Sequence, residues 1–168
     1  PELFKTLDSV IETIPENERW NVYFTALNCL EPAKHGGALR RFKSQEILPL
    51  DIDHTDPART SEYTTIIGNI ISCDMGKVGQ VSTGNGLQYS LQLDKPFNDA
   101  VFFEQKRLQY KSICDRINTA LEAAGLPGGA DPSVWSLARL LRLPSTENRK
   151  PKGIKQAVLL NSNIEPIA

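Results

Sequence analysis

The spacing of hydrophobic residues changes several times along the chain, and each change predicts a new structural element. Apolar residues recur every three or four positions over 3–14, which predicts an amphipathic helix that ends before Pro15. The stretch 20–27 is aromatic and β-branched, as in a buried strand. A second extended stretch covers 47–53, and Pro49 within it predicts a sheet edge or a strand start.

Between residues 57 and 93 the pattern predicts one helix followed by a hairpin. The apolar spacing in 57–72 suits a helix, although the β-branched content leaves a strand open; these residues are Tyr63, Ile66, Ile67, Ile70 and Ile71. Residues 78–82 and 87–93 predict two short strands around the turn 83–86. The Asn-Gly pair in that turn is a strong hairpin signal, because both residue types accept a positive φ.

The last part of the chain predicts two helices and a strand. A long helix is expected over 99–124, ending at Gly125, with apolar positions at Val101, Phe102, Leu108, Ile113, Ile117 and Leu121. Residues 126–130 predict a loop, Asp131-Pro132 starts a second helix that runs to about Leu141, and 157–160 predict a final strand. We therefore expect one α+β domain over residues 1–168 with mostly local strand pairing.

Composition narrows the class of protein. The 168 residues are 40% hydrophobic and 23% charged, the balance of one soluble globular domain that builds a core without disulfides. Cys29, Cys73 and Cys114 include no C-x-x-C pair, which argues against a disulfide framework and a structural zinc site and favours a cytoplasmic location. No apolar run approaches the roughly 20 residues that span a membrane. The start at Pro1, without a Met, predicts a piece of a longer polypeptide.

The net charge hides two basic clusters. The chain carries 19 Lys and Arg against 20 Asp and Glu, for a formal net charge of −1. One cluster comprises Lys34, Arg40, Arg41 and Lys43, and the other comprises Arg139, Arg142, Arg149, Lys150, Lys152 and Lys155. Because local fields rather than net charge attract polyanions, both clusters are candidates for phosphate contacts. A pair of solvated loops explains the same charges without a ligand.

Two carboxylates at the end of the second predicted strand are the first candidates for chemistry. Asp51 and Asp53 are two residues apart, so on a strand their side chains point to one face while Ile52 points to the core. Like charges this close repel unless a cation neutralises them, and carboxylate oxygens suit a divalent metal ion. Two exposed acids before a turn at His54 explain the spacing as well.

Two later segments also allow both a functional and a purely structural interpretation. The glycines of the turn 82–86 let the backbone approach an anion, but an Asn-Gly turn also closes a hairpin without any ligand. Asp131 before Pro132 is typical of a helix N-cap, and an aspartate at a helix start can also bind a metal. The stretch 140–150 mixes apolar residues with spaced cations, which suits phosphate contacts.

The order of these motifs resembles the archaeo-eukaryotic primase (primase-polymerase) superfamily, in particular the catalytic domains of replication proteins from phages, plasmids and other mobile elements. The family's Asp-x-Asp strand corresponds to "LPLDID" at 48–53, and its Ser/Thr-Gly-x-Gly-hydrophobic-His segment corresponds to "STGNGLQ" at 82–88. Its third acid and Arg-rich stretch correspond to "DPSVWSLARLLRLPSTENRK" at 131–150. The resemblance covers nearly the whole chain. Gln88 stands where the family has its His, and Ser145 stands where it has a Gly.

The resemblance implies a fold, a reaction and a set of partners. The fold would be α+β, with an RRM-like antiparallel or mixed sheet, flanking helices and a smaller α/β unit. The reaction would be primer synthesis or extension on a single-stranded DNA template, a nucleotidyl transfer that consumes nucleoside triphosphates and uses two Mg²⁺ or Mn²⁺ ions. A helicase domain or protein would be a further partner.

The resemblance and the charge pattern together assign roles to individual residues. The catalytic metal ligands would be Asp51, Asp53 and Asp131. The nucleotide would contact Ser82, Gly84, Gln88, Arg139, Arg142 and Lys150, and nucleic acid would contact Arg40, Arg41, Lys43, Arg149 and Lys152. Gln88 keeps a hydrogen-bond donor but carries no charge.

Two functions from other classes fit the same sequence. One is a non-catalytic module that binds single-stranded or origin DNA and has lost turnover, as Gln88 would allow. The other is an RRM-type RNA binder, whose exposed sheet aromatics would be Tyr23 and Phe24. The three acidic positions argue against both, because a surface that binds polyanions gains nothing from buried carboxylates.

Overall fold

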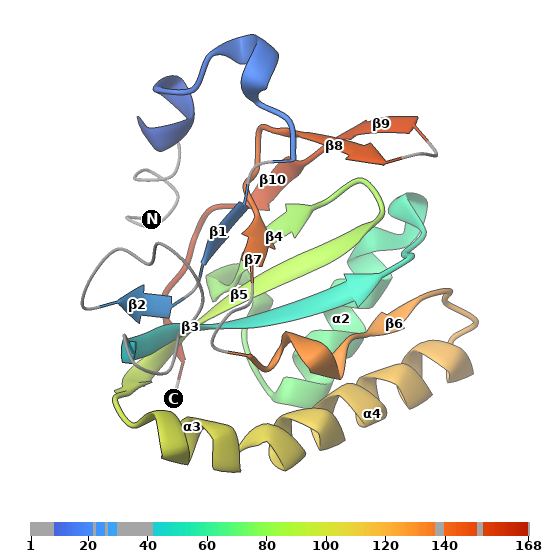
Figure 1. The fold of residues 1–168 in the computed structure, drawn as a ribbon. Coiled ribbons are helices and arrows are strands. Elements are labelled where there is room, and N and C mark those ends of the chain that lie inside the picture. The colour runs from blue at the N-terminus through green and yellow to red at the C-terminus, as the bar shows by residue number, and fades with distance from the viewer. Residues whose placement is uncertain are drawn as a thin grey trace.

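A predominantly antiparallel sheet forms the centre of the molecule (Figure 1). The computed structural model describes residues 9–21, 23–25, 27–29, 42–136, 140–150 and 153–167. Five strands cross the sheet in the order β10 (Val158–Asn161), β4 (Gly79–Ser82), β5 (Gly86–Phe97), β3 (Phe42–Asp53) and β2 (Leu27–Cys29). Two short strands join it: β6 (Gly129–Ala130) runs antiparallel to β3, and β11 (Pro166–Ile167) runs parallel to β5.

The two longest strands, β3 and β5, hold the core of the sheet. They are antiparallel, and Leu50 faces Tyr89 while Ile52 faces Leu87. All four side chains are buried on one face, because residues opposite each other in antiparallel strands share a face. The β4–β5 hairpin confirms the prediction from the Asn-Gly pair of the turn 83–86.

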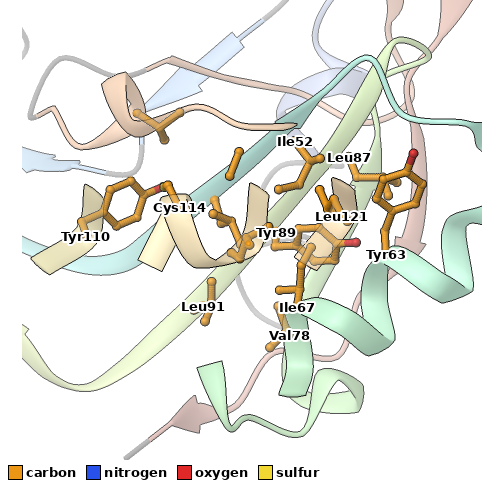
Figure 2. Close-up of a cluster of buried hydrophobic side chains, with 14 of the residues drawn as sticks. Ile52, Tyr63, Ile67, Val78, Leu87, Tyr89, Leu91, Tyr110, Cys114 and Leu121 are labelled. Carbon is orange, nitrogen blue, oxygen red and sulfur yellow. The ribbon is translucent and has the colours of Figure 1, made fainter. Parts of the chain in front are cut away.

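Helices cover that apolar face (Figure 1). Ile67 on α2 (Thr60–Ile71) and Leu121 on α4 (Arg107–Ala123) are fully buried against it, as the close-up in Figure 2 shows. α2 confirms the helix predicted over 57–72; the 3₁₀ turn η3 (Pro57–Arg59) precedes it, and Ser72 ends it with a φ of 54°. The expected α+β class, with an antiparallel sheet flanked by helices, is therefore confirmed.

The helix predicted over 99–124 consists of two segments. α3 (Ala100–Gln105) stops at Lys106, and α4 then continues to Ala123, with Gly125 following at a φ of 62°. The termination at glycine is confirmed, but the predicted apolar face is wrong at its start, because Val101, Phe102 and Leu108 are exposed. The buried face of these helices instead comprises Phe103, Tyr110, Cys114, Ile117 and Leu121.

A second, smaller layer lies on the opposite face of the sheet. There β1 (Tyr23–Thr25) pairs with β7 (Leu140–Arg142), and a hairpin of β8 (Glu147–Lys150) and β9 (Gly153–Gln156) follows. A separate apolar cluster packs beneath this layer; it comprises Ile11, Val81, Leu143 and Ala157, with Leu159 beside them. Residues 9–12 are helical, within the predicted N-terminal helix, and residues 1–8 lie outside the described part. The strand predicted over 20–27 corresponds to β1 and the start of β2.

Two sequence predictions need correction. Pro49 does not mark a sheet edge, because it pairs with Ser90 inside the long strand β3. Its position is tolerated because β2 pairs with 42–45 and β6 with 52–53, so no described strand takes a ladder bond from residue 49 on that side. The helix predicted from Asp131 to Leu141 is the 3₁₀ turn η5 (Pro132–Val134), and β7 follows after residues 137–139, which are outside the described part. Much of the basic stretch after it lies in the β8–β9 hairpin.

Smaller elements complete the described chain. These are the 3₁₀ turns η1 (Glu16–Glu18) and η4 (Met75–Lys77). The strand predicted at 157–160 is confirmed as β10, which begins and ends one residue later. The sequence pattern did not predict β6 or β11, each of which is two residues long. Among the helices of the described part, none combines the length and apolar character needed to cross a membrane.

Candidate functional site

Three acidic residues lie on two adjacent chain segments at one end of β3, on the sheet face opposite the helices. Asp51 and Asp53 alternate with the buried Ile52, so both carboxylates point away from the helical layer. β6 pairs Ile52 with Ala130, which puts the next residue, Asp131, directly across from Asp51; the Asp131 N–H donates to the Asp51 carbonyl at 3.0 Å. The sheet thus joins residues that are far apart in sequence into one acidic group.

Glycines allow the backbones to approach closely around this group. A Cβ on Gly86 would collide with the Ile52 carbonyl oxygen, and a Cβ on Gly128 would collide with the Asp53 carbonyl oxygen. Gly128 also has a φ of 90°, which residues with a side chain rarely adopt. These two glycines therefore fix the positions of the neighbouring strands at the acidic end of β3.

The carboxylate of Asp131 is held in place as a cap. Its Oδ1 accepts a hydrogen bond from the Ser133 N–H at 2.8 Å, and its Oδ2 accepts one from the Ser133 hydroxyl at 2.6 Å. The predicted N-cap role of Asp131, with Pro132 at the first position, is thus confirmed for a turn of three residues. The Asp131 side chain is half-buried, whereas that of Asp51 is buried and that of Asp53 is exposed.

The donor chemistry of this group suits a divalent cation. Carboxylate oxygens are the ligands that Mg²⁺ and Mn²⁺ prefer. The strand pairing places Asp131 across from Asp51 on the adjacent chain segment. As the side chains stand, no group of three His, Cys, Asp or Glu residues in the described ranges is arranged to hold a metal ion. Each carboxylate oxygen has two lone pairs, so Asp131 can cap η5 and bind an ion at the same time.

The hydroxyl of Tyr110 contacts β3 close to the acidic residues. Tyr110 extends from α4 and its hydroxyl donates to the Pro49 carbonyl at 2.9 Å. Burial raises the pKa of Tyr110 well above its ordinary value, and the negative charges of Asp51 and Asp131 contribute to the same shift. Tyr110 is therefore a neutral hydrogen-bond donor that contacts β3 from the helix side of the acids.

Gln88 and Arg142 lie beside the acids on the same face. Gln88 is directly opposite Asp51 in the β3–β5 register, and its Oε1 accepts a hydrogen bond from the Arg142 N–H at 3.0 Å. The side-chain N–H₂ of Gln88 has no acceptor among the described residues. Gln88 thus connects the acidic end of β3 to β7 while keeping a free donor.

The Arg142 guanidinium is buried with no negative partner in the described ranges. Arg142 is only 4% exposed, and its two Nη groups donate to the Tyr23 hydroxyl at 2.6 Å and to Asn21 Oδ1 at 3.3 Å. Its guanidinium carbon lies 4.5 Å from the centroid of the Tyr23 ring. A buried cation without a counter-ion is costly, so this position attracts an anion such as a phosphate.

The glycine turn has structural contacts that sequence analysis did not foresee. Gly84 has a φ of 80°, and the stem of Lys155 on β9 occupies the place where a Cβ would lie. Asn148 on β8 donates through Nδ2 to the Thr83 carbonyl at 2.8 Å, while its buried Oδ1 has no donor in the described part. The turn therefore closes the hairpin, as its structural interpretation predicted, and an unsatisfied acceptor lies beside it.

The remaining predicted site residues are spread more widely. Ser82 pairs with Leu87, which places it on the helix side of the sheet, and Lys43 lies roughly 25 Å along β3 from Asp51. Arg149 is exposed on β8, and Lys150 ends that strand with a side chain that is not described. Four residues lie outside the described residues altogether: Arg40, Arg41, Arg139 and Lys152.

Sequence reasoning missed three polar residues beside the candidate site. They are Asn21, Tyr23 as a partner of Arg142, and Asn148. Asn148 lies inside the stretch 140–150 that the charge pattern singled out. It is the one amide side chain in that stretch, which could have marked it as a candidate site residue. The roles of Asn21 and Tyr23 depend on the pairing of β1 with β7, for which the sequence holds no local signal.

Comparisons with protein-family models, curated proteins and solved structures found no match to this chain.

Proposed function

We propose that this chain is a primase-polymerase domain of the archaeo-eukaryotic primase superfamily, which synthesises or extends primers on a single-stranded DNA template from nucleoside triphosphates. The observation that supports this proposal is the row of Gln88 on β5, Asp51 on β3 and Asp131, which directly follows β6. These residues come from the three motifs that carry the resemblance, which are far apart in sequence. In this reading the central sheet is the RRM-like sheet, and the β1–β7 and β8–β9 pairs belong to the smaller unit.

The acidic and basic parts of the proposed site have separate tasks. Asp51, Asp53 and Asp131 would hold Mg²⁺ or Mn²⁺. Bound divalent ions supply charge neutralisation at the attacking 3′-oxygen and at the triphosphate. Gln88 would donate its free amide N–H to a triphosphate oxygen, and the buried Arg142 guanidinium provides positive charge at the same side of the acids.

Ser145 gives independent support for the motif alignment. It stands where the family has glycine, and its φ is 62°, a left-handed conformation that glycine adopts without strain. The turn is tied to the neighbouring segment, since the Ser145 N–H donates to the Ala157 carbonyl at 2.9 Å. A position that needs glycine geometry therefore coincides with the family's glycine.

A non-catalytic module that binds single-stranded DNA is the second candidate. The observation that favours it is the engagement of the Asp131 carboxylate as a cap, together with the absence of a converged metal-ligand group among the described residues. Gln88, which carries no charge where the family has its His, points the same way. A measurement of metal binding and nucleotide transfer on the same protein separates the two candidates.

The test compares the wild type with Asp51→Asn in a primer-extension assay containing Mg²⁺ or Mn²⁺. We expect the wild type to incorporate nucleotides and Asp51→Asn to lose at least about a thousandfold in rate, or about 4 kcal/mol in activation free energy. Asp94→Asn is the matched control, since Asp94 is exposed on β5 away from the site. Direct Mn²⁺ binding, followed by electron paramagnetic resonance, should weaken in Asp51→Asn only.

Two results would contradict the proposal. Nucleotide transfer by Asp51→Asn at the wild-type rate would remove Asp51 from the catalytic group. A wild type that binds single-stranded DNA but neither binds Mn²⁺ nor transfers nucleotides would establish the non-catalytic module instead.

A further inference from the structure

Two exposed aromatic residues, three positions apart in the chain, belong to the smaller layer, and each ring is paired with an arginine. Trp20 is 47% exposed and Tyr23 is 44% exposed. The Arg149 guanidinium carbon lies 5.6 Å from the Trp20 ring centroid, and that of Arg142 lies 4.5 Å from the Tyr23 ring centroid. We call these four residues the aromatic strip.

Asn21 fixes the strip in one geometry. It lies between the two aromatic residues with a φ of 51°, and its Oδ1 accepts hydrogen bonds from the Arg149 N–H at 3.0 Å and the Arg142 guanidinium at 3.3 Å. Its Nδ2 donates to the Arg149 carbonyl at 3.1 Å, and its N–H donates to the Glu147 carbonyl at 2.8 Å. The rings are thus held before any ligand arrives, which lowers the entropy that binding would cost.

The chemistry of the strip suits nucleic-acid bases. A guanidinium stacked on one face of a ring leaves the other face for a second planar group, and bases stack on aromatic side chains whatever their sequence. Trp20 and Tyr23 are three residues apart, at most roughly 10 Å of extended chain, so a strand of few nucleotides reaches both. Bases inside a duplex are already stacked, which restricts this surface to single strands.

Positive charge next to the rings suits the phosphates of the same strand. Arg149 is exposed on β8, and its guanidinium carbon lies 5.6 Å from the Trp20 ring centroid. Arg149 also forms an ion pair with Glu147 at 2.7 Å. Both partners of that pair are partly exposed, where ion pairs are weak, so a phosphate can replace the Glu147 carboxylate.

We infer that the aromatic strip binds a single strand of nucleic acid, with bases stacked on Trp20 and Tyr23 and phosphates near Arg149. Arg142 joins the strip to the candidate site, because its guanidinium lies on Tyr23 while its N–H donates to Gln88 opposite Asp51. The identification of this strand as the template rests on the proposed function. Binding of the strand itself does not, since it needs no metal ion and no nucleotide.

The first experiment uses the intrinsic fluorescence of the wild type without metal. The chain has two tryptophans, and Trp135 is buried against Phe103 with a ring-centroid distance of 4.3 Å, so a strand in solution can reach Trp20 but not Trp135. We expect oligo(dT) of about 12 nucleotides to quench the fluorescence and a duplex of the same length to leave it unchanged. Equal quenching by both would overturn the inference. An oligo(rU) arm determines whether RNA binds as well as DNA.

The second experiment measures affinity by the anisotropy of a labelled oligonucleotide. We expect Trp20→Ala to weaken binding roughly tenfold to a hundredfold, and Trp20→Phe, which keeps a ring, to weaken it much less. Phe102→Ala is the matched control, because Phe102 is also an exposed aromatic with a cation, Lys106, 4.9 Å from its ring centroid, but lies on α3. We expect wild-type affinity for this control.

Salt dependence distinguishes stacking from charge. Between about 50 and 200 mM salt, Trp20→Ala should keep the wild-type slope of affinity against salt, whereas Arg149→Gln should lower that slope by about 0.7. Unchanged affinity in Trp20→Ala and in a second variant, Tyr23→Leu, would overturn the inference. Binding of oligo(dT) by a wild type that transfers no nucleotides would show that the strip binds a strand even where the proposed function fails.

Discussion

The two faces of the central sheet differ in what they bury, although one strand supplies both. On β3, Ile52 enters the helix-covered core, where Ile67 and Leu121 surround it with hydrocarbon (Figure 2). The adjacent residue, Asp51, is buried on the other face beside Gln88 and Arg142. Successive side chains of a strand point to opposite faces of the sheet. The neighbouring residues Asp51 and Ile52 therefore lie in a polar and an apolar environment, respectively.

This difference assigns stability and chemistry to separate layers. Apolar side chains on the helix face gain free energy from burial alone, about 25 cal/mol for each Å² removed from water. The polar side chains on the other face gain little from burial and lose much if a partner is missing. Asn148 is an example, since it is 2% exposed and its Oδ1 has no donor among the described residues. The helix face therefore holds the larger apolar cluster, and the other face combines a smaller apolar cluster around Val81 with the candidate site.

The largest effect that sharpens this comparison is expected from Ile67→Ala on α2. The variant removes buried methylene groups and leaves a cavity, so the free energy of unfolding should fall by about 2–5 kcal/mol in a urea titration. Leu108→Ala is the control, because Leu108 is 77% exposed and its truncation should change stability little. On the polar face, Asp51→Asn keeps the size of the side chain and creates no cavity, so we expect a much smaller change in stability than for Ile67→Ala. A large loss of stability in Asp51→Asn would break the comparison.

A smaller and pH-dependent effect is expected from Gln88→His. Neutral imidazole has one acceptor nitrogen for the Arg142 N–H, whereas the charged form has two donors and no acceptor. Below about pH 6.5, the charged form should tighten binding of a non-hydrolysable nucleoside triphosphate by up to about tenfold. In the free protein the same protonation breaks the hydrogen bond to the Arg142 N–H, which opposes protonation by on the order of 1 kcal/mol, whereas the facing Asp51 carboxylate favours it. Urea unfolding at two pH values therefore measures which of the two effects is larger.

The measurement for Gln88→His pairs nucleotide affinity with urea unfolding at about pH 6 and pH 8, on either side of the ordinary histidine pKa. Gln92→His is the matched control, because Gln92 is on the same strand and face but is further from Asp51. It should show neither response. Equal nucleotide affinity of Gln88→His at both pH values would place residue 88 outside the nucleotide site.

The smallest effect is expected from Ser145→Gly. A residue with a Cβ at a φ of 62° carries a steric cost of roughly 1–2 kcal/mol, which glycine avoids at a somewhat smaller entropic cost. The variant should therefore raise the free energy of unfolding by up to about 1 kcal/mol, measured by urea denaturation. Ser162→Gly is the control, since Ser162 is exposed and is not among the positive-φ residues of the described chain. A loss of stability in Ser145→Gly would contradict the steric argument.

Local patterns predicted the elements whose partners are nearby in sequence. The Asn-Gly turn determined the β4–β5 hairpin, and the apolar period determined α2. The alternation of Asp51, Ile52 and Asp53 also predicted correctly which side chains share a face. In each of these cases the information lies within a few residues of the element that it specifies.

Elements that depend on distant partners were not predicted. Residues after Asp131 have a start signal for a helix, yet Leu141 forms β7 because it pairs with Phe24 and is buried. The β8–β9 hairpin has four exposed residues in β9, so no apolar alternation marks it. The link between Gln88 and Arg142 needs both of these distant pairings to be in place.

The pairing of Tyr23 with Arg142 has a consequence for the order of folding. The two residues are 119 positions apart, whereas the β4–β5 hairpin closes over a few residues. Contacts between distant parts of a chain form late, because the entropy of closing a long loop must be overcome first. During synthesis the helix-covered layer can assemble while the segment with Arg142 has not yet been made. The acids at the end of β3 therefore acquire the neighbouring Arg142 among the last steps, and a folding intermediate would hold them without it.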